Sequence, residues 1–126
     1  MTYFISGHRD VTEEEFDHYY GLHIYKAAAN NAEFVIGDYE GVDKMAMDLL
    51  WGWRLNNVLP DIKVTVYHMF DSPRNNPGWP TVGGFQTDEE RDAAMTAASD
   101  RDIAWVRPGK ERSGTAQNIA RRFKTK

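Results

Sequence analysis

The sequence predicts a single α/β domain with a mostly parallel sheet flanked by helices on both faces. Short β-prone segments alternate with amphipathic helical segments, an alternation typical of parallel strands joined by right-handed crossovers. The chain has 126 residues, which is enough for one hydrophobic core but not for two. We therefore expect residues 1–126 to form one domain.

Each expected element rests on a local pattern. Thr12 and Glu15 form the capping-box pair that begins the first helix, and Asn30-Asn31 ends it. Thr87, with Glu90 three residues later, repeats this pattern before the third helix. Apolar residues of the second helix recur on one face, and β-branched residues dominate the third strand. The expected strands cover residues 2–5, 33–36, 63–69 and 103–106, and the expected helices cover residues 12–29, 42–53, 87–98 and 113–123.

Residues 70–86 contain prolines, glycines, Trp79 and Phe85 without hydrophobic periodicity. A loop of this length inside a compact domain is usually a functional lid or a disordered segment. Its aromatic residues indicate an ordered, packed loop, which could cover a ligand.

The composition limits the classes of function. The formal charge of −4 gives no general attraction to nucleic acid or to an anionic membrane. There is no cysteine, and the four histidines lack metal-ligand spacing, so we expect no metal site and no cofactor. No apolar run approaches the length of a membrane span, and no leader pattern is visible, so we expect a cytoplasmic protein.

Three expected strands end in segments rich in glycine and polar residues. Ligands of open parallel sheets bind beyond the carboxyl ends of the strands, near the switch in strand order. Small residues there let a ligand approach the backbone. These segments are Ser6-Gly7-His8-Arg9, then Gly37-Asp38 with Gly41 and Asp43, and finally Arg107-Pro108-Gly109 with Ser113-Gly114-Thr115.

Ser113-Gly114-Thr115 opens the last expected helix and is a candidate anion site. The free N–H groups and the dipole at a helix start favour a phosphate. Plain helix capping by serine or threonine is the alternative. No phosphate-loop motif with its lysine is present, so a monophosphate bound without Mg²⁺ is favoured over a triphosphate.

Charged residues at the first two strand ends leave alternatives open. The carboxylates Asp38 and Asp43 could contact ribose hydroxyls or act in acid–base chemistry, or a residue such as Asp43 could cap the second helix. His8 and Arg9 could bind an anion or a base, or Arg9 could form a surface ion pair with Asp10.

Four segments together resemble the SLOG superfamily of Rossmann-like nucleotide-binding domains, from residue 3 to about residue 122. Ser6-Gly7-His8-Arg9 is similar to the opening motif of that superfamily, and Gly41-Val42-Asp43 resembles a segment of its DNA-processing protein A members. Residues 91–95 resemble the Arg-Lys-x-x-Met segment of the lonely guy phosphoribohydrolases. Pro108-Gly109 with Ser113-Gly114-Thr115 resembles their phosphate loop. The resemblance implies a single nucleotide-binding Rossmann-like domain.

The resemblance implies that Ser113, Gly114, Thr115 and Arg91 bind the phosphate of a nucleoside 5′-monophosphate. It also implies cleavage or transfer at the N-glycosidic bond, as in the lonely guy enzymes and the nucleoside deoxyribosyltransferases. The glutamate that closes their motif is Asn118 here, and an amide cannot replace a catalytic carboxylate.

The sequence leaves two hypotheses about function open. In the first, another acid does the chemistry, with Asp38 and Asp92 the leading candidates and Glu111 a third by position. In the second, the protein is a sensor or sequestering protein that binds a nucleotide-derived ligand without cleaving it, and Asn118 contacts that ligand.

We also expect a homodimer or larger oligomer, because related small members pair through helices beside the site. Trp51 and Trp53 lie two residues apart, so one of them could face away from the core. The alternative is that both tryptophans flank a helix–helix contact within one subunit.

Overall fold

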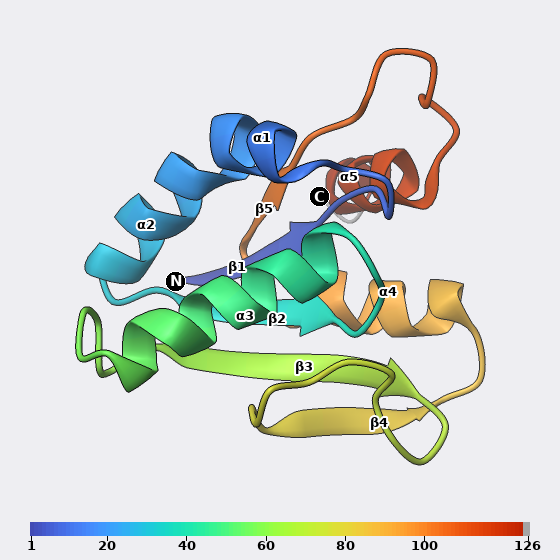
Figure 1. Cartoon of the computed structure of the whole chain (residues 1–126). Coiled ribbons are helices and arrows are strands. Elements are labelled where there is room, and N and C mark those ends of the chain that lie inside the picture. Colours follow the sequence, from blue (N-terminus) through green and yellow to red (C-terminus); the bar gives the residue numbers. More distant parts are fainter. Residues whose placement is uncertain (125–126) are drawn as a thin grey trace.

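The fold is a five-stranded parallel sheet in the order β4-β3-β2-β1-β5, shown by a computed structural model that describes residues 1–124 (Figure 1). All four neighbouring strand pairs are parallel, so the expected α/β fold is confirmed. The strands are β1 (Thr2–Ser6), β2 (Glu33–Gly37), β3 (Lys63–Met69), β4 (Thr81–Phe85) and β5 (Arg101–Ala104).

Helices cover both faces of the sheet (Figure 1). The helices of the first face are α1 (Glu13–Phe16), the π-helical segment η1 (Asp17–Gly21), α2 (Leu22–Ala29) and α3 (Val42–Leu55). The helices of the second face are α4 (Asp88–Ala97) and α5 (Gly114–Lys124). Alternate strand residues serve the two faces: Ile5 belongs to the large core under α2 and α3, whereas Phe4 packs with Met95 of α4 in a smaller core.

The chain moves from β1 through β2 and β3 to β4, then crosses back to place β5 on the other side of β1. The switch in strand order therefore lies between the carboxyl ends of β1 and β5. Open parallel sheets bind their ligands at this position.

The first helical segment is less regular than its sequence predicts. The capping box is present, because the Thr12 hydroxyl accepts from the Glu15 N–H at 3.1 Å and the Glu15 carboxylate accepts from the Thr12 N–H at 3.0 Å. A wider π-helical turn over Asp17–Gly21 then separates α1 from α2. It contains the fully buried Tyr20, whose hydroxyl donates to the Ser6 carbonyl at 2.8 Å.

The segment predicted to be an irregular loop contains the edge strand β4. Before it, Trp79 is only 3% exposed and donates its indole N–H to the Met47 carbonyl at 3.1 Å. Trp51 packs edge-on against Trp79, with ring centroids 4.9 Å apart. The expectation of an ordered, packed segment is confirmed, but the prediction that residues 70–86 contain no strand is wrong.

The last strand begins and ends two residues earlier than predicted, at Arg101 and Ala104. Trp105 leaves the strand ladder because its backbone N–H donates instead to the Tyr20 hydroxyl, at 2.9 Å. Within the described residues, no helix is both long enough and apolar enough to cross a membrane.

Candidate functional site

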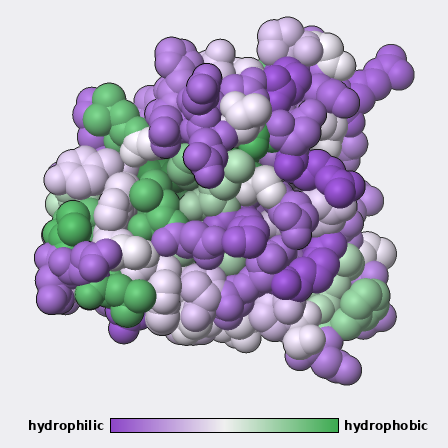
Figure 2. Space-filling model, in the orientation of Figure 1, coloured by the Kyte–Doolittle hydropathy of each residue, from purple (hydrophilic) through white to green (hydrophobic). Residues whose placement is uncertain are grey.

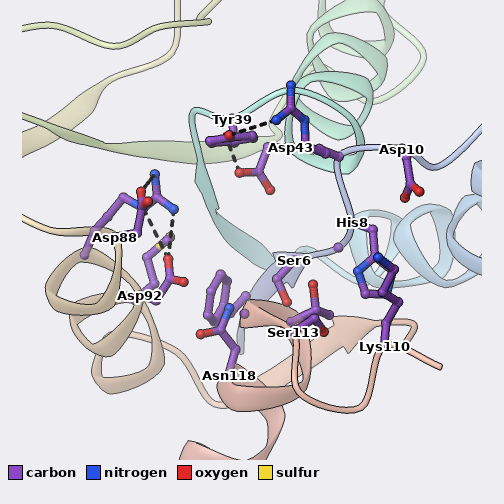
Figure 3. Close-up of a pocket in the computed structure, with 17 residues that line it drawn as sticks. Ser6, His8, Asp10, Tyr39, Asp43, Asp88, Asp92, Lys110, Ser113 and Asn118 are labelled. Carbon is purple, nitrogen blue, oxygen red and sulfur yellow. Dashed lines mark hydrogen bonds and ion pairs between the residues drawn. The ribbon is translucent and has the colours of Figure 1, made fainter. Parts of the chain in front are cut away.

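A cavity of about 580 Å³ opens at the carboxyl ends of β1 and β5, between α4 and the start of α5 (Figure 3). This volume falls within the usual range for small-molecule sites. Its lining comes from several distant segments of the chain: Phe4, Ser6, Gly7, His8, Arg9, Asp10, Tyr39, Asp43, Asp88, Arg91, Asp92, Met95, Lys110, Ser113, Gly114, Thr115 and Asn118.

Ser113 and Ser6 form part of one wall of the cavity. The Ser113 hydroxyl accepts from the Ala116 N–H at 3.2 Å, so the capping alternative is present. The N–H groups of Gly114 and Thr115 have no acceptor among the described residues, as expected for the first turn of a helix. The buried Ser6 hydroxyl also lacks a partner there, and Figure 3 shows it on the same side of the cavity as Ser113.

Arg91 and Asp92 of α4 form the opposite wall, where Figure 3 also places Asp88. The Arg91 side chain is buried, and its guanidinium donates to the Asp92 carboxylate at 3.1 and 3.2 Å. It also donates to Asp38 at 3.0 Å and lies 3.4 Å from Asp88. Arg91 therefore organises three carboxylates, as well as lining the cavity.

Asp92 is largely buried at this wall. Burial raises the pKa of its carboxyl group, although the charge and hydrogen bonds of Arg91 and a hydrogen bond from Asn118 act in the opposite direction. Asn118 is itself buried, and its amide oxygen accepts from Arg121 at 2.7 Å. The two residues therefore share one polar cluster beside the cavity.

Asp38, the other candidate acid, does not line the cavity. It is 1% exposed and accepts three hydrogen bonds from Arg74, at 2.7, 2.8 and 3.3 Å, in addition to the one from Arg91. Burial raises its pKa, but the hydrogen bonds and charge of Arg74, with the charge of Arg91, outweigh this and lower the pKa below its usual value. Asp38 is therefore a buried anion that fastens the 70–80 segment to the end of β2.

Asp43 lies in the first turn of α3 but does not cap that helix. Its Oδ2 instead accepts the backbone N–H of Tyr39 at 3.2 Å. Burial raises the pKa of its carboxyl group to about 7, against the charge of Arg91 and the hydrogen bond from Tyr39. Asp43 therefore lines the cavity and carries a carboxyl group with a pKa close to neutral pH.

His8 and Arg9 both line the cavity. The His8 Nε2 accepts the Arg107 backbone N–H at 2.9 Å, and burial lowers the pKa of the imidazole, so the neutral ring is favoured. Arg9 contacts the Tyr39 ring, 5.5 Å from its centroid. The proposed Arg9 pair with Asp10 does not form, since Asp10 pairs with Arg107 at 3.6 Å.

Four predicted glycine and proline positions do not line the cavity, namely Gly37, Gly41, Pro108 and Gly109. A Cβ at Gly37 would lie 2.7 Å from the Asp43 Oδ2. Gly41 has φ +77°, and a Cβ there would collide with the His8 carbonyl and the Arg9 backbone. Glycine is therefore required where α3 approaches the end of β1.

The sequence reasoning missed Tyr39, Asp88, Lys110 and the role of Arg74. Asp88 lies three and four residues before Arg91 and Asp92, a spacing that places the three on one helix face and could have indicated it. Arg74 lies in a segment without periodicity, so no local signal connects it to Asp38. In the described part of the chain, no group of three or more His, Cys, Asp or Glu side chains is arranged so that it could hold a metal ion.

Neither a scan against models of known protein families nor a search of curated proteins finds a match to this chain.

Proposed function

We propose that this chain is a cytoplasmic protein that binds a nucleoside 5′-monophosphate and cleaves or transfers at its N-glycosidic bond. One observation carries the proposal: one cavity of about 580 Å³ joins the open start of α5 to a wall that carries Asp88 and the largely buried Asp92. The first is suited to a phosphate, and the second to the positive charge that develops at a sugar C1′ during glycosidic cleavage.

The phosphate would lie over the first turn of α5. The free amides of Gly114 and Thr115 point their partial positive charge toward an anion, and the unpartnered Ser6 hydroxyl offers another donor. Lys110 lines the same cavity and adds a cationic side chain. Arg91 contributes less directly, because its guanidinium is already bound to carboxylates.

Asp92 is the carboxylate that we place against the sugar. It lines the cavity, whereas Asp38 does not, and the Arg91 guanidinium fixes its orientation through two hydrogen bonds. A carboxylate held in this way can stabilise an oxocarbenium-like centre or attack it as a nucleophile. Replacement by the amide should lower turnover by about 100-fold or more and leave nucleotide binding largely intact.

The test is incubation of the protein with a panel of ribonucleoside and deoxyribonucleoside monophosphates, followed by detection of released free base. Thr115→Glu should abolish release, because it places a carboxylate at the phosphate position. Gln117→Glu adds the same charge at an exposed position of the same helix and should leave release unchanged. Absence of base release by the wild type from every nucleotide would refute cleavage.

Asn118 supports a second candidate function, a sensor or sequestering protein that holds its ligand intact. It places a buried amide in the cavity, where the resembling enzymes have their glutamate. In that case Asn118→Ala should weaken nucleotide binding by about 1–2 kcal/mol through loss of one hydrogen bond. Measurable binding without base release would favour this candidate.

We further propose that the chain forms a homodimer through α2 and the end of α3. Figure 2 shows hydrophobic side chains on the side of the molecule where these elements lie, and Leu22, Tyr25 and Leu55 are exposed. Trp51 and Trp53 are partly buried and pack against Trp79 and Tyr25, respectively, within the subunit. Sedimentation of only a 14.5 kDa species at micromolar concentration would refute the dimer.

A further inference from the structure

Asp43 is a second aspartate that lines the cavity, beside Asp92. It is 8% exposed, lines the cavity and lies close to the backbone between β2 and α3. Its Oδ2 accepts from the Tyr39 N–H and lies beside Gly37, where a Cβ would be only 2.7 Å from this oxygen, so the absence of a side chain at Gly37 leaves the space that Oδ2 occupies. Within the described residues, Oδ1 has no hydrogen-bond partner, so this oxygen is available to a ligand.

The surroundings of Asp43 favour a protonated carboxyl group. Asp92 faces it from α4 and Asp38 faces it from the end of β2, and both raise its pKa, as burial does. Arg91, also on α4, acts in the opposite direction together with the Tyr39 N–H. A proton on Asp43 would therefore be available close to neutral pH, which suits a general acid.

We propose that Asp43 donates a proton to the departing base, an inference that rests on the proposed glycosidic cleavage. The C1′–N bond breaks and its electron pair stays on the base, while the proton moves from the Asp43 carboxyl group to a base nitrogen. Water supplies the oxygen that bonds to C1′ and loses its proton to Asp92. Solvent exchange then restores the proton on Asp43 and removes the one on Asp92.

Asp38 cannot be the proton donor, although it also follows β2. Its oxygens are occupied by Arg74 and Arg91, and those cations keep it in the charged form. A carboxylate already ionised at neutral pH has no proton to donate. The geometry therefore divides the aspartates into an anchoring one, Asp38, a proton donor, Asp43, and a carboxylate directed at the sugar, Asp92.

The test compares two substrates that differ in their need for an acid. A purine nucleoside monophosphate needs protonation of its leaving base, whereas a 4-nitrophenyl riboside 5-phosphate releases a stable anion without it. Asp43→Asn should lower kcat/KM about 100-fold or more on the nucleotide and less than about fivefold on the nitrophenyl substrate. Asp48→Asn, an exposed position of the same helix, is the control and should keep wild-type values on both.

The pH profile gives a second readout. Wild-type kcat/KM on the nucleotide should fall as the pH rises through about 7, and this limb should be absent with the nitrophenyl substrate. The comparison needs only the wild type, so it decides the matter even if Asp43→Asn fails to fold.

Three results would overturn the assignment. They are full nucleotide turnover by Asp43→Asn, equal losses on the two substrates, and a nucleotide profile without the alkaline limb. In each case base release by the wild type would leave the proposed function standing. Absence of base release by the wild type would instead refute the function itself, and the role of Asp43 with it.

Discussion

Replacement of Asp38 by asparagine removes one negative charge from a carboxylate that is 1% exposed, with almost no change in size. In the wild type this carboxylate accepts three hydrogen bonds from Arg74 and one from Arg91. The variant leaves the Arg91 guanidinium, which is 5% exposed, without the negative charge that lies 3.0 Å from it in the wild type. Breaking one partner of a buried ion pair usually costs about 3–5 kcal/mol.

We expect a loss at the lower end of that range, about 3 kcal/mol, because asparagine keeps one acceptor and Asp92 still binds Arg91. An unfolding entropy of about 2.1 cal/mol/K per residue gives a decrease of about 11 °C in Tm for 126 residues. Urea unfolding followed by circular dichroism measures the free energy directly. Asp48→Asn, whose partner Lys44 is exposed, should change it by less than about 0.5 kcal/mol.

The effect should also depend on pH. The pKa of Asp38 is lowered in the folded protein, so its stabilisation is present above the pKa of the unfolded chain, near 4, and is lost as the pH falls below it. The stability difference between wild type and Asp38→Asn should therefore narrow in acid. An Asp38→Asn protein within about 0.5 kcal/mol of wild type at pH 7 would refute the anchoring role.

Four further substitutions test the packing and the charge states. Trp79→Ala should lower the free energy of unfolding in urea by about 3–5 kcal/mol, because it leaves a cavity at a buried position. Tyr20→Phe should lower it by about 1–3 kcal/mol, because the Ser6 carbonyl and the Trp105 N–H lose their hydrogen-bond partner. A loss below about 1 kcal/mol in either variant would contradict the corresponding contact. As the pH rises from 4 to 8, the free energy of unfolding of Asp43→Asn should increase relative to that of the wild type, because the folded wild-type carboxyl group keeps its proton up to about pH 7. A difference in unfolding free energy that does not change with pH would contradict a protonated Asp43. The Glu15 pKa, about 2 because of its hydrogen bonds from Arg107 and Thr12, should rise in Arg107→Gln when followed by carboxyl NMR; an unchanged value would contradict the pairing.

The overall fold could be predicted from the sequence because most of its strands and helices show patterns within their own residues. Four of the five strands show β-prone or apolar runs, and they alternate with helices whose apolar faces cover the sheet. The strand β4 was not predicted because it lies at an exposed edge of the sheet, where Val82 and the adjacent glycines give no alternation of apolar and polar positions. The early end of β5 escaped because it depends on the Tyr20 hydroxyl, 85 residues away.

The candidate site was predicted in outline for a topological reason. Parallel strands place their carboxyl ends on one edge, so Ser6, Asp43 and Thr115 had to lie near one another. The distinction between Asp38 and Asp43 was not readable, because it depends on where Arg74 and Arg91 dock. Tertiary contacts between distant segments decide the charge state of each carboxyl group, and residue spacing does not encode them.

The most direct test of the proposed nucleotide site is an NMR titration of the ¹⁵N-labelled protein with a nucleoside 5′-monophosphate. Phosphate binding over the first turn of α5 predicts that the amide signals of Gly114 and Thr115 shift most, because their N–H groups gain an acceptor. The same two signals should shift with inorganic phosphate and stay unchanged with the parent nucleoside. Saturable nucleotide binding that leaves both signals in place would contradict the account.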